Sequence, residues 1–482
     1  MTGAADNAES APAAATAPAA PAALPRRVRA AWIVTYPLIV ASAASTTLAV
    51  VDTLLLGRFG TAALATIALA TPVFVFGSAL VVPWGTAVQV LIARLHGAED
   101  TARIGRLLGI GLRVCLAAAL LPTLTIIAAA PWILHVLAGG EVPVEASTVV
   151  RILACTLPLT AVTAHYRGVF GGLGRTRITM QVALGVNIVN IPLDVLLVYG
   201  LGLGAVGSAL GTLAAVASGA GYIAWLARRE LRPDYPAPPI HRSRWRRAAG
   251  GDEKAEGPAS RALAGEVWKI GWPDTTFAVI VYGADVLLTA IVATIGTADL
   301  AGYRLMVTTV TVLWVVVFSC SSGISILAGQ RLGADDEPGA RAALRAGAVL
   351  MAGLCVLVVL LPLLVPYWYF GLFSTDRGVV DAATSAVWVL LLLVPAMVVA
   401  MSLAGLLRAG GDTKGIMYAG GLSQFVLALP VAWFAVQVLG WGIAGAYLGF
   451  ATGILGRAVF TVLRWRQGRW RTALSSAAIG SK

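Results

Sequence analysis

Two acidic side chains stand within long apolar stretches in the first half of the chain. Asp52 belongs to an apolar run that begins at Trp32, and Asp194 lies near the end of the run 177–200. A carboxylate inside a membrane span is costly, so it usually faces a protein interior or a water-filled cavity. Carboxylates in such places bind cations or exchange protons. The alternative interpretation is that each acid lies at a helix end and reaches the lipid headgroups.

The depths of the two acids predict that they belong to one site. Asp52 lies about five residues from the outer end of its span and Asp194 about six, roughly 8–9 Å below the surface for both. Asn190 precedes Asp194 by four residues and therefore shares its helix face. Thr212 on the next span reaches a similar depth, although a threonine hydroxyl often bonds its own helix. We expect these four residues to line a cavity for the coupling cation and the substrate.

The coupling ion is predicted to be either a proton or sodium. Two neighbouring carboxylates in a poorly hydrated cavity disfavour double ionisation, because desolvation and like-charge repulsion both oppose it. We therefore expect the pair to hold a proton near neutral pH and to release it during transport. Sodium can use the same oxygens, with Asp52, Asn190 and Asp194 as ligands, since hard cations bind carboxylate and carbonyl oxygens.

Polar residues inside other spans have less specific interpretations. In the second half, the position equivalent to Asp52 is Leu288, and Asp285 lies three residues earlier. Asp285 is either part of a second polar site or a partner of a neighbouring helix. His165 and Arg167 lie near the cytoplasmic end of their span, where we expect structural or interfacial roles.

The sequence offers no arrangement that predicts an enzyme. The chain has four histidines, which are scattered, and four cysteines, which lie in apolar runs without metal-like spacing. An intramembrane enzyme would need clustered histidines or acids. We therefore expect neither a resident metal nor a cofactor besides the coupling ion, and no disulfide framework.

Composition indicates the elements that must position these residues. The chain has 482 residues, of which 58% are hydrophobic and 12% charged, and its mean hydropathy is +0.84. These values predict an all-α polytopic membrane protein. The net charge of +12 lies mainly in loops between twelve apolar runs, where the positive-inside rule places basic residues. We therefore expect a multi-pass protein of the cell inner or plasma membrane, with both termini in the cytoplasm. We expect no nucleic-acid partner.

The two halves of the chain repeat each other. Pro37 matches Pro273, residues 60–65 match 296–301, and residues 97–100 match 333–336, all at an offset of 236. Six spans in each half give both halves the same orientation, which is typical of transporters with a pseudo-two-fold axis along the membrane normal. The predicted domains are a disordered cytoplasmic tail 1–29, a six-helix bundle 30–228, a cytoplasmic linker 229–262, a second bundle 263–465 and a cytoplasmic tail 466–482.

These motifs resemble the multidrug and toxic compound extrusion (MATE) family over roughly residues 30–465. The resemblance rests on Val51-Asp52-Thr53, the segments 60–65 and 97–100 with their second-half copies, and the segments 172–177 and 410–414. It implies two six-helix bundles that face each other in a V. It also implies export of organic, often cationic compounds, driven by proton or sodium influx.

The resemblance also assigns roles to single residues. In the DinF-like branch of the family, the coupling site corresponds to Asp52, Asn190 and Asp194 here, with Thr212 as a further member. The proline that bends the first helix upon protonation corresponds to Pro37. The NorM-like branch uses acids in the second half, including one on the tenth helix, whereas the span 380–408 has no acid in its interior. This difference favours the DinF-like branch.

The predicted function is that of a secondary active multidrug efflux transporter, an antiporter for H⁺ or Na⁺. The expected partners are a small-molecule drug or metabolite and the lipid bilayer, and we expect a monomer. An alternative on the same superfold is a flippase or exporter of a lipid-linked or endogenous metabolite. Twelve spans and few intramembrane bases argue against that alternative.

Overall fold

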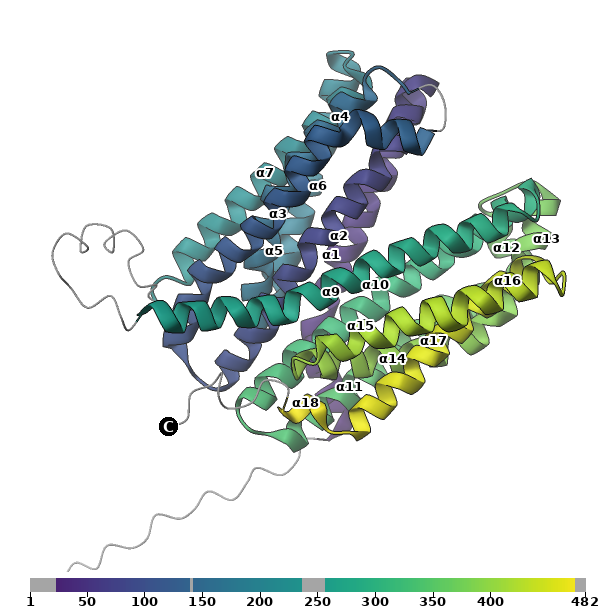
Figure 1. The fold of residues 1–482 in the computed structure, drawn as a ribbon. Coiled ribbons are helices and arrows are strands. Elements are labelled where there is room, and N and C mark those ends of the chain that lie inside the picture. Colours follow the sequence, from purple (N-terminus) through teal and green to yellow (C-terminus); the bar gives the residue numbers. More distant parts are fainter. Residues whose placement is uncertain (1–22, 139–141, 236–255, 473–482) are drawn as a thin grey trace, which may run out of the picture.

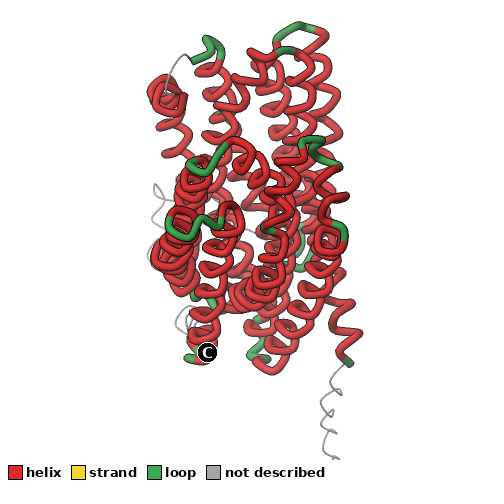
Figure 2. Tube along the Cα trace, turned by 90° about the vertical axis from the view of Figure 1, so that its right-hand side faces the viewer, coloured by secondary structure: helices red, strands yellow, loops and turns green. Residues whose placement is uncertain are grey.

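The structure is a computed structural model of the chain that describes residues 23–138, 142–235 and 256–472. Within these residues every regular element is a helix (Figure 2). Twelve helical segments are long and apolar enough to cross a membrane. The predicted all-α fold with twelve spans is therefore confirmed.

The first six spans form one bundle. Four of them are single helices, the fourth is a helix pair, and the fifth ends in a π-helical segment at Val195–Gly200. The helices are α1 (Leu24–Phe59), α2 (Thr61–Gly97), α3 (Thr101–Ala138), α4 (Ala146–Ala154), α5 (Thr156–Gly172), α6 (Thr176–Asp194) and α7 (Gly204–Glu230).

The last six spans form the second bundle. Its tenth and eleventh spans are each built from several shorter helices in sequence. The elements are α9 (Glu256–Ala293), α10 (Thr297–Gly333), α11 (Glu337–Leu364), α12 (Pro366–Gly371), α13 (Arg377–Ser385), η3 (Val387–Val389), α14 (Leu390–Ala409), α15 (Thr413–Leu422), η4 (Ser423–Ala428), α16 (Leu429–Gln437), α17 (Gly442–Arg466) and the short α18 (Arg469–Thr472).

Some helices begin outside the predicted domain boundaries. The first helix starts at Leu24 rather than residue 30, with Pro25 in its first turn, where proline is well tolerated. The helix α9 starts at Glu256, inside the segment 229–262 that we predicted as a linker. Hydropathy reports where a helix enters the bilayer and not where it begins, so both helices extend further than predicted. The predicted disorder of residues 1–22 and most of the linker fall outside the described residues.

The two bundles form a V (Figure 1). They lie close together near α18 and diverge toward α4 in one bundle and α13 in the other. Helix α2 packs against α9 and α10, and α1 packs against α10 and α11. The narrow end carries the connections 97–101 and 333–337, and the wide end carries 200–204 and 437–442. The cavities described below lie between these ends.

The repeat produces a reciprocal contact at the narrow end. Gly97 ends α2 and Gly333 ends α10, at the same offset of 236 that the sequence shows. A Cβ atom on Gly97 would overlap the carbonyl oxygen of Gln330, and one on Gly333 would overlap that of Arg94. Glycine permits this close approach of two backbones because it lacks a Cβ atom. The two helices therefore meet backbone to backbone.

Candidate cation and substrate sites

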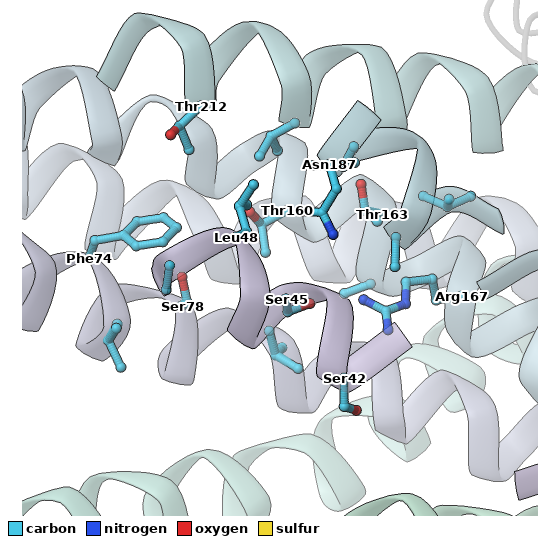
Figure 3. A pocket seen from close by; sticks show the side chains of 18 of the residues that line it. Ser42, Ser45, Leu48, Phe74, Ser78, Thr160, Thr163, Arg167, Asn187 and Thr212 are labelled. Carbon is cyan, nitrogen blue, oxygen red and sulfur yellow. The ribbon is translucent and has the colours of Figure 1, made fainter. Parts of the chain in front are cut away.

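A cavity of about 620 Å³ lies in the first bundle and reaches the interface with the second. Its walls come from α1, α2, α5, α6 and α7, together with residues of α10. Figure 3 shows Ser45 of α1 facing the same space as Thr163 and Arg167 of α5 and Asn187 of α6. The lining therefore offers hydroxyl, amide and guanidinium groups, and Asp52 adds a carboxylate.

The structure brings together the two acids and the asparagine that the sequence predicted as one site. Asp52 lines the cavity, and its carboxyl group lies near enough to that of Asp194 for the two to interact. Asn190 and Asp194 are both 0% exposed. They lie behind the lining, so of the four residues that we expected to line the cavity only Asp52 and Thr212 do so. The Nδ2 atom of Asn190 donates a hydrogen bond of 3.2 Å to Oδ1 of Asp194.

Three oxygens of this cluster have no hydrogen-bond partner among the described residues. They are Oδ1 of Asp52, Oδ1 of Asn190 and Oδ2 of Asp194, and all three are buried. Ionised carboxylates only accept hydrogen bonds, so two of them cannot bond each other. Buried polar atoms are normally satisfied. A proton shared by the acids, or a hard cation bound by the three oxygens, would satisfy the cluster.

The chain changes its helical form next to Asp194. Pro192 lacks a backbone N–H, which removes one helical hydrogen bond before the acid. Asp194 is the last residue of α6, and the π-helical segment Val195–Gly200 follows it. On the neighbouring helix, a Cβ atom on Gly211 would overlap Oδ1 of Asp194. The acid therefore fits only because α7 presents a glycine, a requirement that we did not predict from the sequence.

Thr212 lies next to that glycine and lines the cavity (Figure 3). It is 8% exposed, and its hydroxyl makes no hydrogen bond with the described residues. The Thr212 hydroxyl is therefore not bonded to its own helix in the structure. Whether Thr212 binds a cation stays a prediction.

Two residues of the fifth span hold α1 against that span, and we did not predict either of them as a site residue. Asn187 Nδ2 donates to the carbonyl oxygen of Ala44 at 2.9 Å, and the hydroxyl of Tyr199 donates to that of Leu55 at 2.6 Å. The two bonds flank Asp52 along α1. The spacing of Asn187 and Asn190 was a visible signal, because residues three apart share a helix face.

Pro37 is buried within α1, which is helical from Leu24 to Phe59. Five residues further along α1, the hydroxyls of Ser42 and Ser319 lie 3.5 Å apart across the two bundles. Arg167 lines the cavity, and its structural or interfacial role stays a prediction. His165 is 0% exposed and lies outside this lining.

A second cavity of about 600 Å³ lies in the second bundle. It adjoins the first, since both share the lining residues Val82, Thr86, Gln89, Phe318 and Ser322. Asp285 lines this cavity together with Tyr303, Trp314 and Tyr447. The Asp285 carboxylate lies near enough to Arg304 of α10 to interact with it electrostatically. Both interpretations of Asp285, a second polar site and a partner of a neighbouring helix, stay predictions.

The MatE family model matches residues 37–196 and 276–434, one segment in each bundle and together more than half of the chain. The chain belongs to the MatE family. It is thus a multi-pass membrane transporter of the multidrug efflux family, and not an enzyme.

Curated relatives and solved structures agree with this assignment. The chain is 23% identical over 458 residues to a probable multidrug resistance protein NorM of Photorhabdus laumondii, covering 90% of this chain and 94% of the relative. It is 28% identical to the protein of the same name from Bradyrhizobium diazoefficiens, covering 86% and 88%. The eukaryotic MATE transporter AtDTX14 has the same fold, with a TM-score of 0.79 at 18% identity over 93% of this chain and 97% of that one. The DinF-like branch stays a prediction.

Proposed function

We propose that this MatE transporter exports organic and often cationic compounds by antiport with H⁺ or Na⁺. The observation that carries the proposal is the buried cluster of Asp52, Asn190 and Asp194. It leaves three oxygens without partners, and Asp52 connects it to a cavity of about 620 Å³. A cation that binds this cluster acts at the wall of a space large enough for a drug-sized molecule.

The cluster can couple cation influx to drug export through α1. A proton on the acid pair removes their repulsion and allows a hydrogen bond between them, which changes how α1 sits against α6 and α7. Pro37 leaves one helical hydrogen bond unmade and so is the place where α1 can bend. A proton that binds the acid pair from the wide end would then release the drug. Loss of that proton at the narrow end would return the site to its starting state.

The orientation of the chain in the membrane follows from its charges. The connections at the narrow end, together with the first few turns of the helices that follow them, carry Arg103, Arg106, Arg175, Arg177, Arg341, Arg345 and Lys414. The positive-inside rule places this end in the cytoplasm. The cavities would then open outward, with both termini cytoplasmic. We propose the domains 30–228 and 263–465 as the two halves of a monomeric transporter.

Transport by purified protein in liposomes tests the proposal. A fluorescent cationic dye is loaded, and either a pH gradient or a sodium gradient is imposed alone. We expect one gradient to drive dye movement in the wild type and not with Asp52→Asn. If sodium alone drives efflux, the proton mechanism fails and the site remains. If neither gradient moves any dye, the proposed function fails.

A further inference from the structure

A charged cluster lies at one end of the second cavity, away from Asp285. Arg408 Nε donates to Asp274 Oδ2 at 3.0 Å, and the two side chains are 11% and 7% exposed. Arg457 of α17 lies near enough to interact electrostatically with both. Its guanidinium carbon stands 4.5 Å from the centroid of the Phe277 ring. All four residues line the cavity.

Arg457 has no anionic partner of its own. The residue is 4% exposed, and its Nε and Nη2 atoms are buried without a hydrogen bond to any described residue. A guanidinium carries five N–H donors in a fixed fork that fits a carboxylate. Buried charges are normally paired. Asp274 is already engaged by Arg408, so the three charged groups sum to one uncompensated positive charge.

Two partly buried arginines of this bundle do have partners. Arg464, near the cytoplasmic end of the same helix, donates to both carboxylate oxygens of Asp412, at 2.7 and 3.1 Å. Arg408 likewise uses both oxygens of Asp274. Where the fold uses an arginine to join helices, the chain therefore supplies the acid. Arg457 instead faces a cavity.

The opposite charge stands further along the same cavity. Asp274 and Asp285 are eleven residues apart on α9, about 16 Å along the helix axis. Aromatic rings of Tyr282, Tyr303 and Tyr447 line the cavity near Asp285, and such rings favour cations. The two acids and two arginines that line this cavity sum to zero charge. Arg457 and Asp285 lie at different positions along it, and Arg304, outside the lining, interacts with Asp285 electrostatically.

We propose that the second cavity binds amphoteric compounds, with an anionic group such as a carboxylate at Arg457 and a cationic group toward Asp285. The aromatic body of the compound would then lie against the rings between them. This inference rests on the proposed transport function and narrows its substrate class. The anion belongs to the transported molecule, and Arg457 recognises it through its unpaired donors.

A matched pair of dyes tests the inference. Tetramethylrhodamine carries a free carboxylate beside its cationic ring system, and its methyl ester has the same ring system without the negative charge. Binding of each to the purified full-length protein is measured by fluorescence polarisation. We expect the wild type to bind the free acid about tenfold more tightly than the ester, as for a hydrogen bond to a charged group. Arg457→Gln should remove this preference and leave ester binding within about twofold.

Two further variants locate the effect. Arg457→Lys keeps the charge without the fork and should retain part of the preference. Arg167→Gln changes an arginine of the first cavity and should leave the preference intact. The inference is wrong if the wild type binds both dyes equally, a comparison that needs no variant, or if Arg167→Gln removes the preference in place of Arg457→Gln. The proposed function still stands in either case if a gradient drives export of the ester. Failure of the wild type to move either dye under either gradient would overturn both.

Discussion

Replacing Asp52 by asparagine should leave the fold intact and stop coupling. In the wild type, Asp52 Oδ1 and Asp194 Oδ2 are buried without partners. An asparagine at position 52 has nearly the same shape but donates hydrogen bonds, so it can bond the Asp194 carboxylate directly. Asp52→Asn therefore imitates the protonated pair permanently, and no change in gradient can reverse it.

The size of the effect depends on pH. At alkaline pH the wild-type carboxylates repel each other, while the variant gains a hydrogen bond to a charged group worth about 1.5–3 kcal/mol. This gain should raise the melting temperature by a few degrees. As the pH falls, the wild-type pair takes up a proton and forms an equivalent hydrogen bond, so the difference shrinks.

The assay combines melting with transport. Tryptophan fluorescence follows unfolding of the purified protein across the pH range, and liposomes report dye efflux under the gradient that drives the wild type. Asp285→Asn is the matched control for stability, because the Asp285 carboxylate has no acidic partner within hydrogen-bond distance among the described residues. A variant of Asp52 that melts below the wild type at every pH, or that exports at the wild-type rate, would refute the reasoning.

Two further predictions concern glycines. Gly211→Ala adds a Cβ atom that overlaps Oδ1 of Asp194, so coupled efflux should fall at least tenfold in liposomes. Gly221→Ala on the same helix meets no atom within 4 Å and should keep full activity, with helix stability up to about 1 kcal/mol higher. Gly333→Ala would overlap the carbonyl oxygen of Arg94 and should lower the melting temperature by several degrees, as overpacking costs about 1–3 kcal/mol. Equal melting of Gly333→Ala and Gly221→Ala would contradict the described contact.

Depth and periodicity were enough to predict that Asp52, Asn190 and Asp194 meet. Span length fixes how deep a residue lies, and a spacing of four fixes the helix face, so three positions on two helices converge without knowledge of the packing. The same rules gave the twelve spans and the two bundles. They could not give Gly211, because its importance depends on how closely α7 approaches α6.

Arg457 shows a different limit. A base inside an apolar run is itself a signal for a functional site, so the residue could have been singled out. The lack of an acidic partner for Arg457 could not be predicted. Arg408 and Arg464 look the same in sequence, and each has an acidic partner in the structure. Only the packing of α9, α14 and α17 decides which arginine is left over. The start of α1 at Leu24 was missed for a related reason, since hydropathy does not record where a helix begins in water.

Because α2 and α10 touch through glycines at the narrow end, a small tilt there moves their far ends by a large distance. Each helix has 37 residues and is about 55 Å long, and the two touch at their last residues. A tilt of about 6° at that point displaces the far ends by about 6 Å, more than the rise of a whole helical turn. The touching surfaces are a glycine Cα and a carbonyl oxygen, whose attraction is weak. Two hydrogen bonds between the bundles must also break before this end can part: Gln330 donates to the carbonyl oxygen of Gly172 at 2.9 Å, and Gln89 donates to the hydroxyl of Ser322 at 3.1 Å.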